Sequence, residues 1–188
     1  FIKNPTSPPQ FKMADALQRA CRDGDLDSAK KLVNEDKVDP SLCNKKGETP
    51  LHLACWNGQL EVAKWLVDEC KVDPSCKDED GDTPFHFACK TDNSTVAEWL
   101  VDKCKVDPNL QNNDGETPLQ LACLKGHLEI VKWLVNECEV DLNQTNKNGE
   151  TPLHLACRRG DLELIRWLLA KCDVTFIRKK RKSEEISQ

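Results

Sequence analysis

The apolar residues of this chain follow a helical pattern that restarts every 34 residues. In one copy, residues 51–55 and residues 60–67 each place apolar side chains on one helical face, which predicts two short helices. Thr49 suits the cap of the first helix, and Pro50 suits its first turn, where a missing N–H costs nothing. Gly58 is expected to end that helix, since a helix exit favours a residue with positive φ.

The segment after each second helix is predicted to be an extended loop. Pro74 disfavours a helical conformation in the residue before it, and residues 44–47 (NKKG) are typical of a tight turn. Each copy is therefore expected to be a helix, a turn, a second helix and a loop with a turn at its tip. Because chains below about 40 residues bury too little surface to fold alone, we expect the copies to stack into an all-α solenoid.

Five copies align in one register. The first-helix motif is found at residues 49–55 (TPLHLAC), 83–89 (TPFHFAC), 117–123 (TPLQLAC) and 151–157 (TPLHLAC), with a weaker copy at 15–21 (DALQRAC). The second-helix motif is found at residues 29–33, 63–67, 97–101, 131–135 and 165–169. These copies predict a repeat domain over residues 13–175, with units at about 13–46, 47–80, 81–114, 115–148 and 149–175.

The repeated run G-x-TPLHLAC-x-x-G-x-L-E-x-x-x-W-L-V resembles the ankyrin repeat, and the resemblance covers about residues 13–172. It implies stacked helix pairs with β-hairpin-like fingers, a concave partner-binding face made of fingertips and first helices, and no catalysis. The family's usual period is about 33 residues, one shorter than here. Residues 91–94 (TDNS) replace x-Gly-x-Leu, so the turn of the third unit is expected to be less regular. The first unit lacks the TPLH run and is expected to be an N-terminal cap.

The two ends of the chain are expected to lie outside the repeats. Residues 1–12 are interpreted as a disordered Pro-rich leader or a segment foreign to the natural protein, because the chain begins at Phe1 rather than Met. Residues 176–188 are expected to form a flexible basic tail. Five consecutive basic residues resemble a nuclear-import run, and chance in a charged tail is the alternative. These residues are Arg178, Lys179, Lys180, Arg181 and Lys182.

Composition narrows the function classes further. The net charge is −5 and both ends are basic, so the body is more acidic than the whole chain and argues against nucleic acid as the partner. No apolar run is long enough to span a bilayer, and no signal sequence is visible. We therefore expect an intracellular, cytoplasmic and monomeric protein, with the nucleus as a second possible compartment.

The eleven cysteines are predicted to be structural thiols. Five of them recur on the first helices, and packed helices lie about 8–10 Å apart, too far for a disulfide. We expect these five to be small buried residues in a reducing compartment, and Cys43 and Cys76 to be more exposed. The recurring set is Cys21, Cys55, Cys89, Cys123 and Cys157.

The histidines of the TPLH motif each precede a cysteine by three residues, which raises the possibility of a metal site. A zinc site needs about four convergent ligands, and these pairs belong to separate units, so no metal and no cofactor are expected. The resemblance implies instead that each histidine bonds the backbone of the neighbouring finger. Gln120 is expected to replace it in the fourth unit. No G-x-S-x-G, P-loop or zinc-type cysteine pair is present, so an enzyme with a small-molecule substrate is not expected.

The tryptophans fall into two groups. Trp65, Trp99, Trp133 and Trp167 recur on the second helices and are expected to cover the seams between units, partly exposed on the convex side. Trp56 occurs once, at a position that faces the groove in the resembled family. It is a candidate binding hot spot, and packing against a neighbouring finger is the alternative.

The variable positions of the repeat are predicted to bind a partner protein or peptide, with a merely solvated surface as the alternative. At the fingertips they are Lys45, Lys46, Glu79, Asp80, Asp82, Asn113, Asp114, Lys147 and Asn148. On the groove side of the first helices they are Arg22, Trp56, Asn57, Lys90, Thr91, Leu124, Lys125, Arg158 and Arg159. The predicted function is a protein-interaction scaffold; the alternatives are a nuclear regulatory factor that uses the basic tail, and the binding module of a larger protein.

Overall fold

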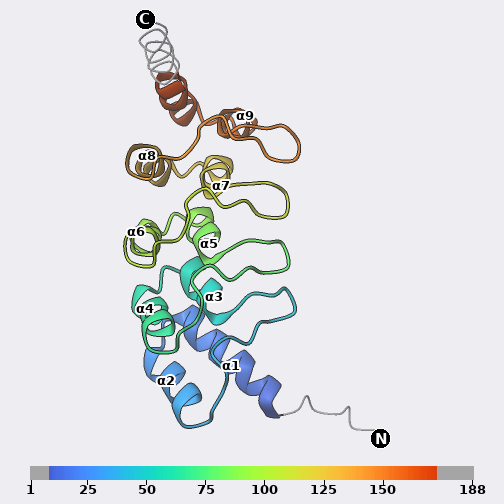
Figure 1. Cartoon of the computed structure of the whole chain (residues 1–188), viewed down its shortest axis with the longest axis vertical. Coiled ribbons are helices and arrows are strands. Elements are labelled where there is room, and N and C mark those ends of the chain that lie inside the picture. Colours follow the sequence, from blue (N-terminus) through green and yellow to red (C-terminus); the bar gives the residue numbers. More distant parts are fainter. Residues whose placement is uncertain (1–8, 173–188) are drawn as a thin grey trace, which may run out of the picture.

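The computed structural model describes residues 9–172, which form a stack of helix pairs (Figure 1). The pairs are α1 (Pro9–Asp23) with α2 (Leu26–Asn34), α3 (Pro50–Trp56) with α4 (Leu60–Asp68), α5 (Pro84–Lys90) with α6 (Ser94–Asp102), and α7 (Pro118–Lys125) with α8 (Leu128–Glu137). Helix α9 (Pro152–Arg159) pairs with helical residues 162–172. The predicted all-α repeat solenoid is confirmed.

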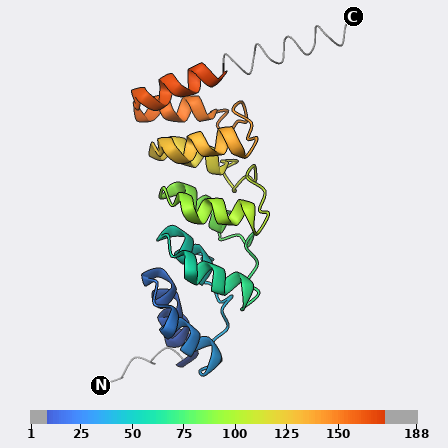
Figure 2. The same cartoon turned by 90° about the vertical axis from the view of Figure 1, so that its left-hand side faces the viewer.

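The odd-numbered helices form an inner column and the even-numbered helices an outer one, seen face-on in Figure 2. Each inner helix packs on the next inner helix along the chain. Side chains such as Leu66, Leu100 and Leu134, all fully buried, fill the space between the columns. No unit has a core of its own, so each gains most of its burial from its neighbours.

The loops between units project from the inner column as fingers (Figure 1). Each finger folds back on itself through a short backbone bond, as between Asn44 N and Glu48 O (2.9 Å). Within residues 9–172 no strand is present, so the fingers are hairpin-shaped loops rather than β-hairpins. Backbone bonds also join neighbouring fingers, as between Glu79 N and Lys46 O (3.0 Å).

The turn of the third unit is as regular as the others, so the expectation of a distorted turn was wrong. Asp92 adopts φ 60°, close to the φ of 70° at Gly58 and 76° at Gly126 in the same place. Aspartate tolerates this left-handed conformation better than most residues, which explains why the glycine can be absent. At the ends of the outer helices, Lys71 and Lys105 take the same conformation, with φ of 59° and 56°.

Helix α1 begins at Pro9, so residues 9–12 are helical and the predicted boundary of the leader at residue 12 was wrong. Proline at the first position of a helix loses no hydrogen bond, because that N–H has no partner within the helix. Residues 1–8, the basic tail with the run 178–182, and the last residues of the predicted fifth unit lie outside the described residues. No helix within residues 9–172 is long and apolar enough to cross a membrane.

The recurring cysteines are buried in the first four units, but Cys157 is exposed, and its predicted burial was wrong. The equivalent Cys123 is fully buried because α9 packs on α7, whereas no described unit packs beyond α9. Cys43 is exposed as predicted, and Cys76 is partly buried.

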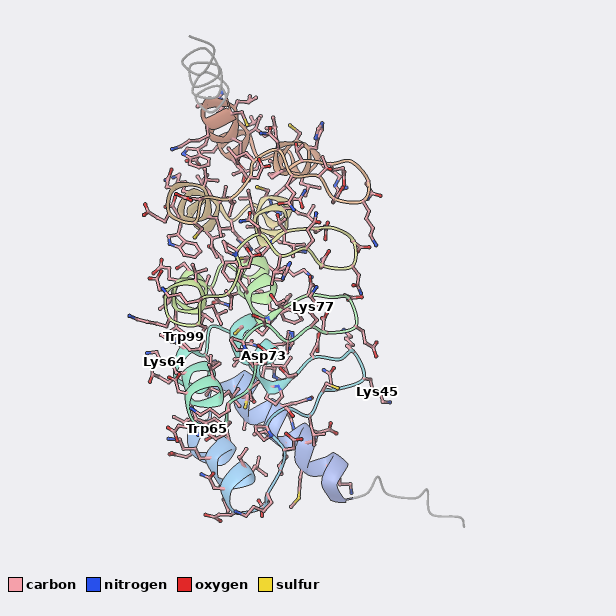
Figure 3. All side chains as sticks on the ribbon, in the orientation of Figure 1. Lys45, Lys64, Trp65, Asp73, Lys77 and Trp99 are labelled. Carbon is pink, nitrogen blue, oxygen red and sulfur yellow. The ribbon has the colours of Figure 1, made fainter. Side chains whose placement is uncertain are left out.

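Three of the outer tryptophans are partly exposed, as predicted, but Trp65 is only 4% exposed. Its ring belongs to the buried apolar cluster of the outer column (Figure 3), so the expectation of partial exposure was wrong at this position.

Candidate functional site

Eight of the nine predicted fingertip residues are exposed, and they follow one edge of the stack. Lys45 marks this edge at the far end of the first finger (Figure 3). Backbone bonds join consecutive tips, from Asn113 N to Asp80 O (2.8 Å) and from Lys147 N to Asp114 O (2.9 Å). The edge is therefore continuous and held by the main chain, which lowers the entropy cost of binding to it. The exposed residues are Lys45, Lys46, Glu79, Asp80, Asn113, Asp114, Lys147 and Asn148.

The ninth, Asp82, is not a tip residue, and its predicted placement was wrong. Its side chain is 1% exposed, because the finger has already turned back toward α5 at this position. The carboxylate accepts a hydrogen bond from Asn112 Nδ2 (2.8 Å) and pairs with Lys90 Nζ (2.5 Å). Asp82 therefore ties the second finger to α5, the inner helix that follows it, and to the third finger.

Replacing Asp82 with asparagine is expected to lower the free energy of unfolding by about 2 kcal/mol, because a buried ion pair loses one charge. Urea denaturation followed by circular dichroism at neutral pH measures the effect. Glu150→Gln is the matched control, since it removes the equivalent pair with Arg158 (2.7 Å), whose side chain is 51% exposed. Equal shifts of the midpoint in the two variants would contradict a buried role for Asp82.

The groove-side residues line the inner column beside the fingers, and they differ in exposure. Six of them are exposed: Arg22, Trp56, Asn57, Lys125, Arg158 and Arg159. Lys90, Thr91 and Leu124 are partly buried. Together with the fingertips they form what we call the inner face, a surface that runs along all the described units.

Trp56 is the large apolar side chain of the inner face, and it is 42% exposed. Its ring packs edge-on against Phe87 of α5, with 5.6 Å between ring centroids. Asn93 Nδ2 donates to its carbonyl oxygen (2.7 Å), which fixes the backbone at the end of α3. The ring therefore packs on the next unit, on an inner helix rather than the predicted finger, and still leaves a large area exposed; its role as a binding hot spot stays a prediction.

A hollow of about 550 Å³ lies at the N-terminal end of the inner face, between α1, the first finger and α3. Its lining combines the apolar Leu53 with charged side chains of both signs, among which only Arg22 was predicted. Sequence reasoning missed the others because it considered only the fingertips and the ends of the first helices, and these residues lie at other positions of the repeat. The lining residues are Asp15, Gln18, Arg19, Arg22, Asn44, Glu48 and Leu53.

Two of the three motif histidines, His52 and His86, hold the neighbouring finger as predicted, whereas His154 bonds Thr151 of its own helix cap. His52 Nε2 bonds the carbonyl oxygen of Asp82 (3.1 Å), and His86 Nε2 bonds that of Glu116 (3.3 Å). Gln120 replaces the histidine by donating to the carbonyl oxygen of Glu150 (2.9 Å). Sequence reasoning gave His127 no role. Its Nε2 bonds the carbonyl oxygen of Lys90 (3.0 Å) and so links the fourth unit to the third.

One histidine–cysteine pair has the spacing of a nucleophile and its base. Cys76 Sγ lies 3.9 Å from His52 Nδ1. Burial raises the pKa of Cys76 to about 11 and lowers the pKa of His52, so the thiol stays protonated and the ring neutral near pH 7. A reactive cysteine needs the opposite shift, which argues for a structural contact. Within residues 9–172, no group of three or more histidine, cysteine or acidic side chains could hold a metal ion.

Comparison with known families agrees with this geometry. The family model described as ankyrin repeats (3 copies) matches residues 17–111 and 95–178. Comparison with curated proteins gives no match.

Proposed function

Because the chain belongs to the ankyrin-repeat family, whose repeats generally act as protein–protein interaction modules, we propose that it is a scaffold that docks a partner protein on the inner face. The family is typically non-enzymatic, and its partners are generally proteins. The proposed surface combines the exposed fingertips with the exposed ends of the inner helices. A flexible or helical segment of the partner could follow it across several units.

Trp56 is the observation that carries this placement. A tryptophan that is 42% exposed, yet held by Phe87 and Asn93, presents apolar area without losing much side-chain entropy on binding. Binding hot spots are enriched in tryptophan and are surrounded by polar rims, here the charged fingertips. Docking over this ring would bury the largest apolar side chain of the inner face.

Replacing Trp56 with alanine is expected to weaken the partner complex by about 2 kcal/mol, or about 30-fold in Kd, while the lost contact with Phe87 lowers the free energy of unfolding by only about 1 kcal/mol. Calorimetric titration of the full chain with a partner protein, isolated by affinity purification on this chain, measures the loss of affinity. Leu162→Ala is the matched control, since Leu162 is 67% exposed on the helical residues 162–172 of the outer column. A partner that binds both variants equally would place the site elsewhere.

The compartment and assembly state are part of the same proposal. Ten cysteines, from Cys21 to Cys157, are free thiols, which favours a reducing, intracellular compartment. Thiols without disulfides fit a monomeric protein of the cytoplasm. The nuclear alternative rests on residues 178–182, which lie outside the described residues.

A further inference from the structure

The inner face carries an alternating arrangement of charge. In units two to five, an acidic residue precedes the capping threonine, and the residue eight positions later is the last or next-to-last residue of the inner helix. In the third unit these positions hold Asp82 and Lys90, which form an ion pair of 2.5 Å. In the fifth unit they hold Glu150 and Arg158, paired at 2.7 Å. The spacing therefore brings the two side chains within reach of each other.

In the second and fourth units the basic partner is missing. Trp56 stands at the position opposite Glu48, and Leu124 at the position opposite Glu116. Within residues 9–172, neither glutamate forms an ion pair within 4 Å. Both glutamates are partly exposed, and Glu48 lines the hollow beside α1. In each of these units an apolar residue thus takes the repeat position that holds the cation elsewhere, and the carboxylate eight residues before it has no ion-pair partner among the described residues.

The electrostatics of Glu116 support this description. Burial raises the pKa of its carboxyl, a hydrogen bond from Asn112 lowers it, and the neighbouring Asp114 and Asp82 raise it again. Lys90 also lowers it, but its ammonium group is already paired with Asp82. The net shift is upward, so a cation brought by a partner would stabilise the ionised form of Glu116.

A lysine or arginine side chain fits such a site in two ways. Its aliphatic stem can cover Trp56 or Leu124 while its charge reaches the adjacent carboxylate. At Trp56 the ring face adds a cation–π attraction. The third and fifth units do not offer this fit, because Lys90 and Arg158 already occupy the position and would repel a second cation.

The spacing of the two sites sets the spacing of the ligand. Neighbouring packed helices lie about 8–10 Å apart, so sites two units apart are separated by about 16–20 Å. An extended chain rises about 3.3 Å per residue, so five or six residues span that distance. We propose that the partner segment docks in an extended conformation and carries two basic side chains about five or six residues apart, one at Trp56 and Glu48, the other at Leu124 and Glu116. This inference rests on the proposed docking function of the inner face.

Selection of a displayed random 12-residue peptide library on the full chain tests the inference. The expected result is enrichment of peptides with two lysines or arginines five or six positions apart. The double variant Glu48→Gln with Glu116→Gln should lose this enrichment and bind the best synthetic peptide about tenfold more weakly in fluorescence anisotropy, since each exposed pair contributes up to about 1 kcal/mol. Glu61→Gln, on the exposed surface of α4, is the matched control and should bind as the unmodified chain does.

The outcomes separate this inference from the proposed function. Enriched peptides that lack paired basic residues, or that are acidic, would overturn the inference, while loss of their binding in Trp56→Ala would preserve the docking function. Equal binding of the basic peptides to the double variant would also overturn it. A selection with no enrichment over a blank support would count against both proposals.

Discussion

Replacing His86 with alanine is expected to lower the free energy of unfolding by about 4 kcal/mol. His86 is fully buried; its Nδ1 accepts a hydrogen bond from Thr83 N (3.1 Å), and its Nε2 therefore donates to the carbonyl oxygen of Glu116. Alanine would leave the buried N–H of Thr83 without a partner and the carbonyl oxygen of Glu116 with only its bond from Asn112 N, and would open a cavity where the ring was. Urea denaturation followed by circular dichroism measures the shift.

Two variants separate the role of His86 from a general effect of substitution. His154→Ala is expected to cost far less, because His154 is exposed and bonds only its own helix cap, through Thr151. His86→Gln should retain most of the stability, because Gln120 makes both contacts in the fourth unit: its Oε1 accepts from Thr117 N (2.8 Å), and its Nε2 reaches the next finger. A similar loss in His86→Gln and His86→Ala would contradict this explanation.

The same residue predicts a dependence on pH. Burial lowers the pKa of His86 to about 4, against about 6.5 in an unfolded chain. Between these values only the unfolded chain takes up the proton, so the contribution is fully present above pH 6.5 and is lost as the pH falls toward 4. The loss amounts to about 3 kcal/mol, and His86→Gln should remove this part of the acid sensitivity.

These contacts show which parts of the fold the sequence can predict. Thr83 and Pro84 indicate a helix start, because threonine caps helices and proline suits the first turn. The period of 34 residues predicts that neighbouring units repeat the same contacts. His86 and Gln120 could be assigned to the neighbouring finger because they share one position in the repeat. Where a residue makes the same contacts as its counterparts in the other units, the contacts predicted for one unit therefore apply to all of them.

The failures arise where one unit departs from the others or lacks a neighbour. His154 and Cys157 match the motif, but burial depends on the unit stacked beyond them, which a motif cannot describe. Asp82 was grouped with the variable fingertip positions, but its counterparts in the second, fourth and fifth units are all acidic, and the backbone turns inward one residue before the capping threonine. Asp92 replaces a glycine without changing the turn, because the left-handed conformation is accessible to aspartate.

The candidate site was predicted less completely than the fold, for a related reason. Trp56 could be singled out because it breaks the repeat, and breaking the repeat is a signal in the sequence itself. Glu48 gave no such signal, because all its counterparts are acidic and the difference lies in the missing cation eight residues later. Arg19 lines the hollow from within the first-helix motif, at a position that was not among the predicted fingertip or groove-side positions.

Replacing Gly47 with alanine is expected to lower the free energy of unfolding by about 3 kcal/mol. Gly47 has φ 76°, a conformation that costs other residues about 1–2 kcal/mol. An added Cβ would also lie 2.7 Å from the backbone nitrogen of Glu79, the atom that bonds Lys46 O on the preceding finger. The substitution therefore strains the turn and separates two fingers, and thermal or urea unfolding measures the sum.

Gly149→Ala is the control that separates the backbone strain from the loss of contact between the fingers. Gly149 has nearly the same φ, 75°, but no atom within 4 Å of its Cβ position, so only the backbone strain applies. The difference between the two variants, expected to be about 1–2 kcal/mol, is then the free energy by which adjacent fingers support each other. Equal losses would mean that the fingers are held by their own turns and helices alone, and that the edge proposed to dock a partner is not stiffened by contacts between units.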